Sequence, residues 1–129
     1  MHMTVPGTIF EAIGGFDPID RIVVALYKRI EKHPDLIPIF PDDLTETARK
    51  QQLFLTQFFG GPKLYLEDRG HPMLRRRHLP FEITPLRRDA WLECLAGALD
   101  EAKIKEPYRT AIYDRIAMTA EHMMNTPEH

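Results

Sequence analysis

The chain has 129 residues, a formal net charge of −2, 43% hydrophobic residues and 28% charged residues. These values are ordinary for a globular protein, and we expect a single domain over 1–129. The small net charge argues against a general nucleic-acid binder, and the longest apolar stretch, 22–27, is too short to cross a membrane. The N-terminus lacks signal-peptide blocks and the single cysteine, Cys94, excludes an intrachain disulfide, so we expect a cytoplasmic protein with no membrane partner.

Helix signals recur in the first third of the chain, whereas strand signals are weak. A short helix is predicted over 8–14, where Thr8 and Glu11 form a capping box before two glycines. A second helix is predicted to begin with Asp17 as N-cap and Pro18 in its first turn, and to end at Pro34. Its apolar residues recur at helical spacing: Ile19, Ile22, Val23, Leu26, Tyr27 and Ile30.

The rest of the chain predicts an all-α fold with about five helices. A helix over 43–59 stops at two glycines and a proline, and a loop containing Tyr65 and a short helix leading to His78 follow. Prolines at 85 and 107 begin the last two helices. Their apolar residues recur at helical spacing: Leu86, Ala90, Trp91, Cys94, Leu95, Ala98 and Leu99, then Tyr108, Ala111, Ile112, Ile116 and Met118.

The run HPMLRRRHLPF over 71–81 is the strongest candidate for a functional segment. A lone histidine is usually a surface or capped residue, but here Pro80 forces the chain out of helix just after His78. Zinc needs four ligands, and no second His or Cys lies at a suitable spacing, so a metal at His78 requires a macrocycle. The three arginines fit either a solvated basic face or an anion site, with Arg77 as the best propionate partner and Lys50 as a weaker one.

Three polar side chains lie on otherwise apolar helix faces: Tyr27, Gln51 and Trp91. Each taken alone is best interpreted as a core residue whose polar tip has found a partner. Brought together from three helices, they would form a group of hydrogen-bond donors in an apolar cavity. Such a group suits dioxygen at a ferrous iron, because its outer atom carries partial negative charge, and suits carbon monoxide less.

The chain resembles the group II truncated haemoglobins, bacterial globins with a two-over-two helical sandwich around a haem. The most specific part of the resemblance is HPMLRxRHxPF over 71–81, and it extends to Tyr27, Phe40-Pro41, Gly60-Gly61-Pro62 and Asp89-Ala90-Trp91-Leu92. Some relatives have tyrosine where this chain has Phe40, and many have a smaller residue at Thr47. The departure at Phe40 places more weight on Tyr27, Gln51 and Trp91. Two interpretations of Thr47 stay open: the threonine narrows a side entrance to the haem, or it adds a weak hydrogen-bond donor.

The resemblance implies a role for each matching position. It makes His78 the proximal ligand of a haem b iron, and it places four residues on the distal, ligand-binding side: Tyr27, Thr47, Gln51 and Trp91. It assigns the haem contacts and propionate partners to a further ten: Phe40, Lys50, Phe54, Leu55, Tyr65, Met73, Leu74, Arg77, Phe81 and Ile83.

Three functions remain open on these residues. The leading hypothesis is reversible dioxygen binding with slow release, with carbon monoxide, nitric oxide and, in the ferric form, cyanide as further ligands. The alternative is a haem redox enzyme, a nitric oxide dioxygenase or peroxidase-like activity, whose nitric oxide reaction needs an external reductase because the chain has no flavin or nicotinamide motif. A haem-free helical binding module is the third. Both a monomer and a homodimer are compatible with the sequence.

Overall fold

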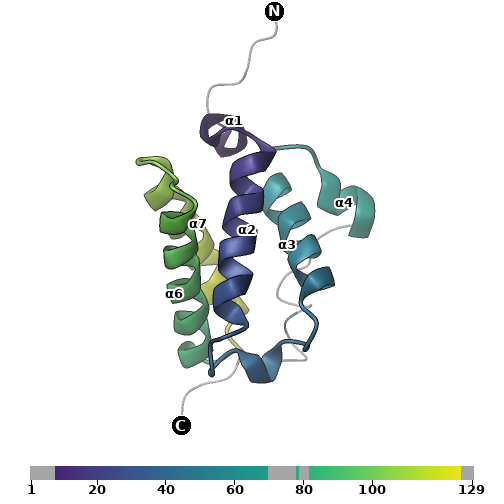
Figure 1. Ribbon diagram of the computed structural model, residues 1–129, viewed down its shortest axis with the longest axis vertical. Coiled ribbons are helices and arrows are strands. Elements are labelled where there is room, and N and C mark those ends of the chain that lie inside the picture. Colours follow the sequence, from purple (N-terminus) through teal and green to yellow (C-terminus); the bar gives the residue numbers. More distant parts are fainter. Residues whose placement is uncertain (1–7, 70–77, 79–81, 126–129) are drawn as a thin grey trace, which may run out of the picture.

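The computed structural model describes residues 8–69, 78 and 82–125, and in this part of the chain all regular structure is helical. Its helices are α1 (Ile9–Ile13), α2 (Phe16–Ile30), the 3-10 helix η1 (Ile37–Ile39), α3 (Thr45–Phe58), α4 (Leu64–Arg69), α6 (Pro85–Glu101) and α7 (Tyr108–Met123). Helix α2 packs against both α6 and α3, while α7 packs against α6 and α1 (Figure 1). The prediction of an all-helical fold is confirmed. None of the described helices is long and apolar enough to cross a membrane.

The first two helices are separated by the predicted glycine turn, but α2 begins earlier than predicted. Thr8 caps α1, its side chain accepting a hydrogen bond from the Glu11 N–H at 3.3 Å, and Gly14 ends the helix with φ 109°. The N-cap of α2 is Gly15, not Asp17, and the helix begins at Phe16. The Phe16 ring packs edge-on against Phe10 with a centroid distance of 5.0 Å, which draws that residue into the helix.

The apolar face predicted for α2 forms the centre of the core. Its fully buried residues are Ile19, Ile22, Leu26 and Ile30, and α6 and α7 bury Leu95, Leu99 and Ile112 against the same cluster. Three residues predicted on the apolar faces of α6 and α7 are instead exposed: Leu86, Tyr108 and Met118. They lie at helix positions that no other described element covers, so helical spacing alone overestimated the width of those faces.

The loop predicted around Tyr65 is a helix, α4, and that prediction was wrong. Tyr65 is buried and packs edge-on against Phe54 of α3 at 5.7 Å. The side-chain oxygen of Gln57 accepts a hydrogen bond from the Leu66 N–H at 2.9 Å, within the first turn of α4. A helix this short depends on such tertiary contacts, because its own sequence gives little helical signal.

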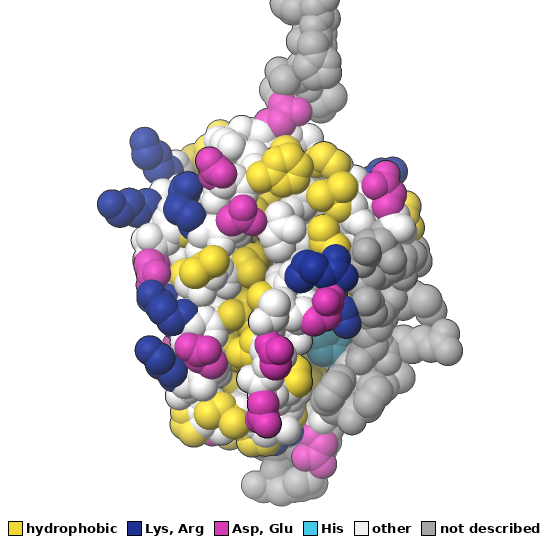
Figure 2. Space-filling view, turned by 45° about the vertical axis from the view of Figure 1, so that its right-hand side comes forward, with side chains coloured by type: hydrophobic (Ala, Val, Ile, Leu, Met, Phe, Trp, Pro, Cys, Tyr) yellow, Lys and Arg dark blue, Asp and Glu magenta, His cyan; other side chains and the backbone are white. Residues whose placement is uncertain are grey.

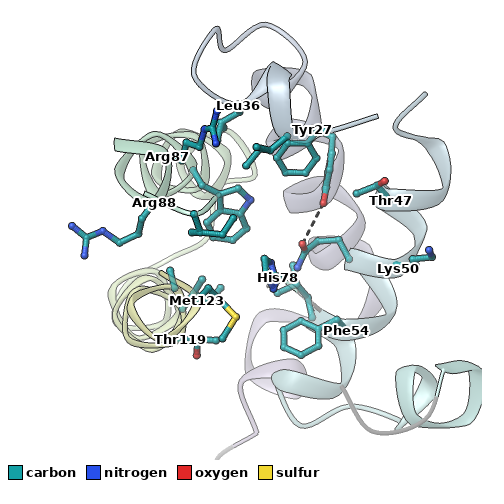
Figure 3. Close-up of a pocket in the computed structure, with 18 of the residues that line it drawn as sticks. Tyr27, Leu36, Thr47, Lys50, Phe54, His78, Arg87, Arg88, Thr119 and Met123 are labelled. Carbon is teal, nitrogen blue, oxygen red and sulfur yellow. Dashed lines mark hydrogen bonds between the residues drawn. The ribbon is translucent and has the colours of Figure 1, made fainter. Parts of the chain in front are cut away.

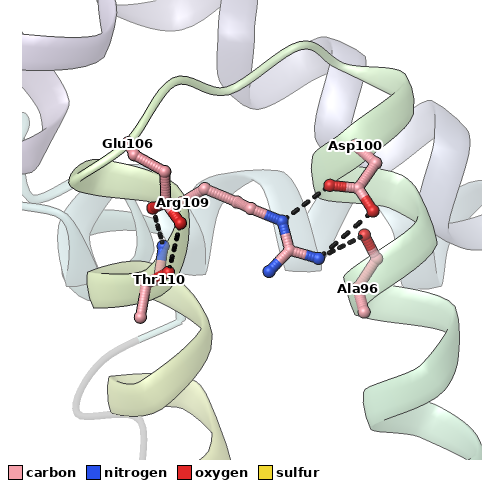
Figure 4. A network of polar contacts seen from close by, with 5 residues as sticks. All are labelled: Ala96, Asp100, Glu106, Arg109 and Thr110. Atoms are coloured by element: carbon pink, nitrogen blue, oxygen red, sulfur yellow. Dashed lines mark hydrogen bonds and ion pairs between the residues drawn. The ribbon is translucent and has the colours of Figure 1, made fainter.

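A polar network joins the end of α6 to the beginning of α7 (Figure 4). The Arg109 guanidinium donates to both carboxylate oxygens of Asp100, at 2.6 and 3.2 Å, and holds the pKa of that carboxyl below its usual range. Glu106 accepts from the backbone N–H of Thr110 at 2.8 Å and also from its hydroxyl. These contacts fix the turn that brings α7 back along α6.

The face of the molecule shown in Figure 2 carries charged side chains of both signs around a central group of apolar ones. The lysines, arginines and carboxylates are interspersed rather than gathered into one patch.

Gly61 provides a test of the contact between α1 and α3. A Cβ added there would lie 2.7 Å from the Phe10 ring and 2.9 Å from the Thr56 carbonyl oxygen, which also accepts the Gly61 N–H. Since neither atom can move freely, Gly61→Ala is expected to lower the free energy of unfolding by about 1–3 kcal/mol in urea denaturation. Gly97→Ala is the comparison: its Cβ would lie 2.5 Å from Nε of Arg29, a partly exposed side chain that can shift at the cost of its contact with Glu101, and helix propensity favours alanine, so we expect a smaller change. Equal stability of wild type and Gly61→Ala would contradict this packing.

Candidate functional site

A cavity of about 280 Å³ lies where α2, α3, α6 and α7 meet (Figure 3). All the predicted site residues that the structure describes line it: Tyr27, Phe40, Thr47, Lys50, Gln51, Phe54, Leu55, Tyr65, His78, Ile83 and Trp91. The other four predicted residues, Met73, Leu74, Arg77 and Phe81, lie outside the described residues. The fold therefore brings residues from most of the chain to one place.

Helix α3 supplies one wall of the cavity through its helical periodicity. Thr47, Gln51, Phe54 and Phe58 follow one another at intervals of three or four residues and so share one face of the helix. Phe54 and Phe58 stack with centroids 5.3 Å apart. This wall is polar at the beginning of α3 and aromatic toward its end, as Thr47 and Phe54 illustrate in Figure 3.

Tyr27 of α2 extends its hydroxyl toward α3. The hydroxyl donates to Oε1 of Gln51 at 3.3 Å, longer than a usual O–H···O hydrogen bond (Figure 3). Burial raises the pKa of the Tyr27 phenol well above its ordinary value, so the group keeps its proton at neutral pH. The ring packs edge-on against Phe40 at 6.3 Å, which fixes the direction of the hydroxyl. Tyr27 thus presents a protonated and weakly engaged donor to the cavity.

Trp91 of α6 contributes a second donor. It is half-buried and lines the cavity, and its indole N–H forms no hydrogen bond with any residue in the described part of the chain. A tryptophan N–H usually finds a partner when it is enclosed. A tryptophan that lines a cavity without such a partner fits a site for a ligand with an acceptor atom.

His78 is half-buried and also lines the cavity, and its backbone is helical as predicted. Figure 3 shows its imidazole between the labelled side chains of Phe54 and Met123 in that view. The described residues contain no group of three or more His, Cys, Asp and Glu that could hold a metal ion. An imidazole in an apolar cavity with no such group fits a metal whose other ligands come from a cofactor.

Cationic side chains lie at the edge of the cavity, and two of them were not predicted. Lys50 is half-buried and forms no salt bridge with any described residue, so its ammonium group is available to an anion. Arg87 donates to the Glu82 carbonyl at 2.7 Å, and Arg88 donates to Asp89 at 2.8 Å, so both arginines already have partners. Their position one turn before Trp91 is a signal that could have identified them.

The prediction also missed apolar lining residues from η1 and α7. They are Leu36, Ile39, Ile116, Ala120 and Met123, with Thr119 beside them. On α7 the sequence contained a signal, because 116, 119/120 and 123 repeat at the spacing of one helix face. Leu36 and Ile39 lie among prolines and gave no periodic pattern.

A helical fold with an apolar cavity, faced by one histidine and several hydrogen-bond donors, defines a globin-like protein. Residues 8–125 match the family described as bacterial-like globin. The group 2 truncated haemoglobin of Bacillus subtilis is 52% identical over 92% of this chain and 89% of its own length. The crystal structure of the group II truncated haemoglobin of Bacillus anthracis is 57% identical, with a TM-score of 0.95 over 98% of this chain and 97% of that one. The truncated oxygen-avid haemoglobin of Bacillus subtilis superposes with a TM-score of 0.88 at 52% identity. The chain belongs to the bacterial-like globins, as a group II truncated haemoglobin.

Membership in the globins implies a haem, and the described residues fit one. A haem requires an axial nitrogen, apolar walls for a flat ring and cations for its carboxylates. His78 supplies the nitrogen, the aromatic residues of α3 supply an apolar wall, and Lys50 supplies a cation, all at a single cavity. The donor chemistry of the site therefore agrees with the cofactor of the family.

Proposed function

We propose that this chain binds haem b through the imidazole of His78 and uses it to hold dioxygen reversibly, with slow release. Haem, when bound, supplies an iron that accepts a diatomic ligand at an open position. The observation that carries the proposal is the convergence of three donors, Tyr27, Gln51 and Trp91, on the cavity that His78 also lines.

The donors have complementary roles in this proposal. The Tyr27 hydroxyl keeps its proton, and its long hydrogen bond to Gln51 is weak enough to be redirected to a ligand. The Gln51 amide can then donate to the Tyr27 oxygen and hold the phenol in place. Trp91 adds an N–H with no other partner among the described residues. A hydrogen bond to a ligand atom with negative charge is worth about 1.5–3 kcal/mol, which favours retention.

Lys50 and Arg77 are proposed as partners for the haem carboxylates, and Phe40, Phe54 and Ile83 as part of the apolar walls. The single thiol, Cys94, is free and buried, which fits a reducing compartment and favours the cytoplasm as the place of action.

Absorption spectra of the purified protein in ferric, ferrous, oxy and carbonmonoxy forms, with dissociation rates, test the proposal. We expect an intense Soret band, slow dioxygen release, and a higher melting temperature with haem than without, because haem binds the native state. A protein that gains no Soret band after haem supplementation would be a haem-free helical module. Fast dioxygen loss together with rapid consumption of nitric oxide in the presence of a reductase would favour the redox function.

A further inference from the structure

Asn125, two residues after the end of α7, joins that end of the helix to His78 and Ile83. Its side-chain Nδ2 donates to the His78 carbonyl oxygen at 3.2 Å, and its Oδ1 accepts from the Ile83 N–H at 3.0 Å. Its backbone N–H also donates to the Ile83 carbonyl at 3.0 Å. We call these three hydrogen bonds the Asn125 bridge. They span 47 and 42 positions of sequence, so they are tertiary contacts and not part of a local turn.

The bridge reaches His78 at a point where the backbone hydrogen bonds of a helix do not continue. The His78 backbone is helical, whereas Glu82, the residue whose N–H would pair with the His78 carbonyl in a continuing α-helix, lies outside any helix. An asparagine amide provides one donor and one acceptor on the same short side chain. It therefore serves the carbonyl of His78 and the N–H of Ile83 at once, which an aspartate or an alanine cannot do.

The residues around the bridge belong to the cavity. His78 and Ile83 line it, and so does Met123, two residues before Asn125 on the last turn of α7 (Figure 3). The His78 carbonyl carbon is bonded to the Cα that carries the imidazole, so a hydrogen bond that holds the carbonyl restrains the backbone from which the side chain projects. The bridge thus acts on the histidine through its own peptide group.

We propose that Asn125 is a positioning residue that sets the place of the His78 imidazole in the cavity. This inference rests on the proposed function, in which His78 holds the haem. The bridge could instead serve only to attach the end of α7, and that role would affect stability without affecting the histidine. Only the positioning role predicts a change in the iron–histidine bond when Asn125 is replaced.

Two variants separate the bonds of the bridge. Asn125→Asp keeps the acceptor for the Ile83 N–H and replaces the donor to His78 by a second acceptor. Asn125→Ala removes both side-chain bonds. Thr110→Val, at the opposite end of α7, is the matched control, because it removes a hydroxyl bond to Glu106 far from His78 while keeping the side-chain shape.

Three measurements are made on wild type and variants. Haem transfer to excess apomyoglobin gives the haem loss rate, resonance Raman of the ferrous protein gives the iron–histidine stretching band, and amide hydrogen exchange gives the protection of Ile83. We expect the loss rate to rise roughly fivefold in Asn125→Asp and roughly tenfold or more in Asn125→Ala, from the usual worth of one and two hydrogen bonds. The band should shift or broaden in both, while Ile83 protection should fall only in Asn125→Ala.

The outcomes distinguish this inference from the proposed function. Normal haem uptake, with the band and the loss rate of both Asn125 variants equal to those of Thr110→Val, would overturn the positioning role alone. A wild-type protein that takes up no haem would overturn the proposed function and the positioning role with it. In that case the Ile83 exchange rates would still show whether the bridge exists.

Discussion

Tyr27→Phe is expected to raise the dioxygen dissociation rate of the haem-loaded protein by about ten- to a hundredfold. The variant keeps the ring that packs against Phe40 and removes only the hydroxyl. In the wild type the Tyr27 hydroxyl keeps its proton and makes one long hydrogen bond, so it is available to donate to a ligand. A hydrogen bond to a charged ligand atom is worth about 1.5–3 kcal/mol. Each 1.4 kcal/mol corresponds to about a factor of ten. Stopped-flow displacement of dioxygen by carbon monoxide measures the rate.

Tyr113→Phe is the matched control, because Tyr113 is a half-buried phenol on α7 that does not line the cavity. Its dissociation rate should equal that of the wild type. Carbon monoxide release should change less than dioxygen release in Tyr27→Phe, since carbon monoxide carries less charge. If dioxygen release is unchanged, the main donor is Trp91 or Gln51. Trp91→Phe, alone and combined with Tyr27→Phe, then measures how strongly the two donors are coupled.

The parts of the fold that could be predicted from the sequence are those fixed by local chemistry. Thr8 and Thr84 cap their helices, and Gly14 ends α1, as their residue types predict. The error at Asp17 arose because an aromatic contact between Phe10 and Phe16 lengthened α2. The error at Tyr65 has the same origin, since contacts with α3 stabilise α4. Tertiary packing overrides local propensity at both places.

The candidate site shows the same division. The sequence predicts three of the site residues because each is polar on an apolar helix face: Tyr27, Gln51 and Trp91. All three line the cavity. The Asn125 bridge had no such signal, because an asparagine near the end of a chain gives no indication of a contact 47 positions away. Polar residues that break a helical pattern are visible in a sequence, whereas polar residues in irregular segments become visible only in the structure.

The arrangement divides the site into a part that holds the cofactor and a part that determines what stays bound. His78 is connected through its backbone to α7, while the donors come from α2, α3 and α6. The two parts share the cavity but are held by different hydrogen bonds, Tyr27 to Gln51 on the donor side and the His78 carbonyl to Asn125 on the other. Substitutions of the donors should therefore change ligand release without changing haem retention. Substitutions on the His78 side should change haem retention without changing ligand release.

His78→Ala is expected to abolish stable haem binding. Among the described lining residues no other histidine or cysteine is present to replace the axial nitrogen. The remaining lining residues are apolar side chains, hydrogen-bond donors and cations, which can pack around a flat ring but offer its metal no imidazole. Haem added to the variant should transfer to apomyoglobin at least about a hundredfold faster than from the wild type, corresponding to roughly 3 kcal/mol or more of lost binding free energy.

His33→Ala is the control, because His33 is also half-buried but lies outside the cavity, with Nδ1 accepting the Asp35 N–H at 3.3 Å. It should retain haem as the wild type does. Free imidazole offers a second check, since the space left by His78→Ala can admit it and restore an axial nitrogen, and with it the spectrum of the wild-type protein. Unchanged haem retention and spectra in His78→Ala would refute the proximal role and direct the search to residues 70–77 and 79–81. Loss that imidazole reverses would show that the nitrogen itself, rather than the packing of the side chain, holds the cofactor.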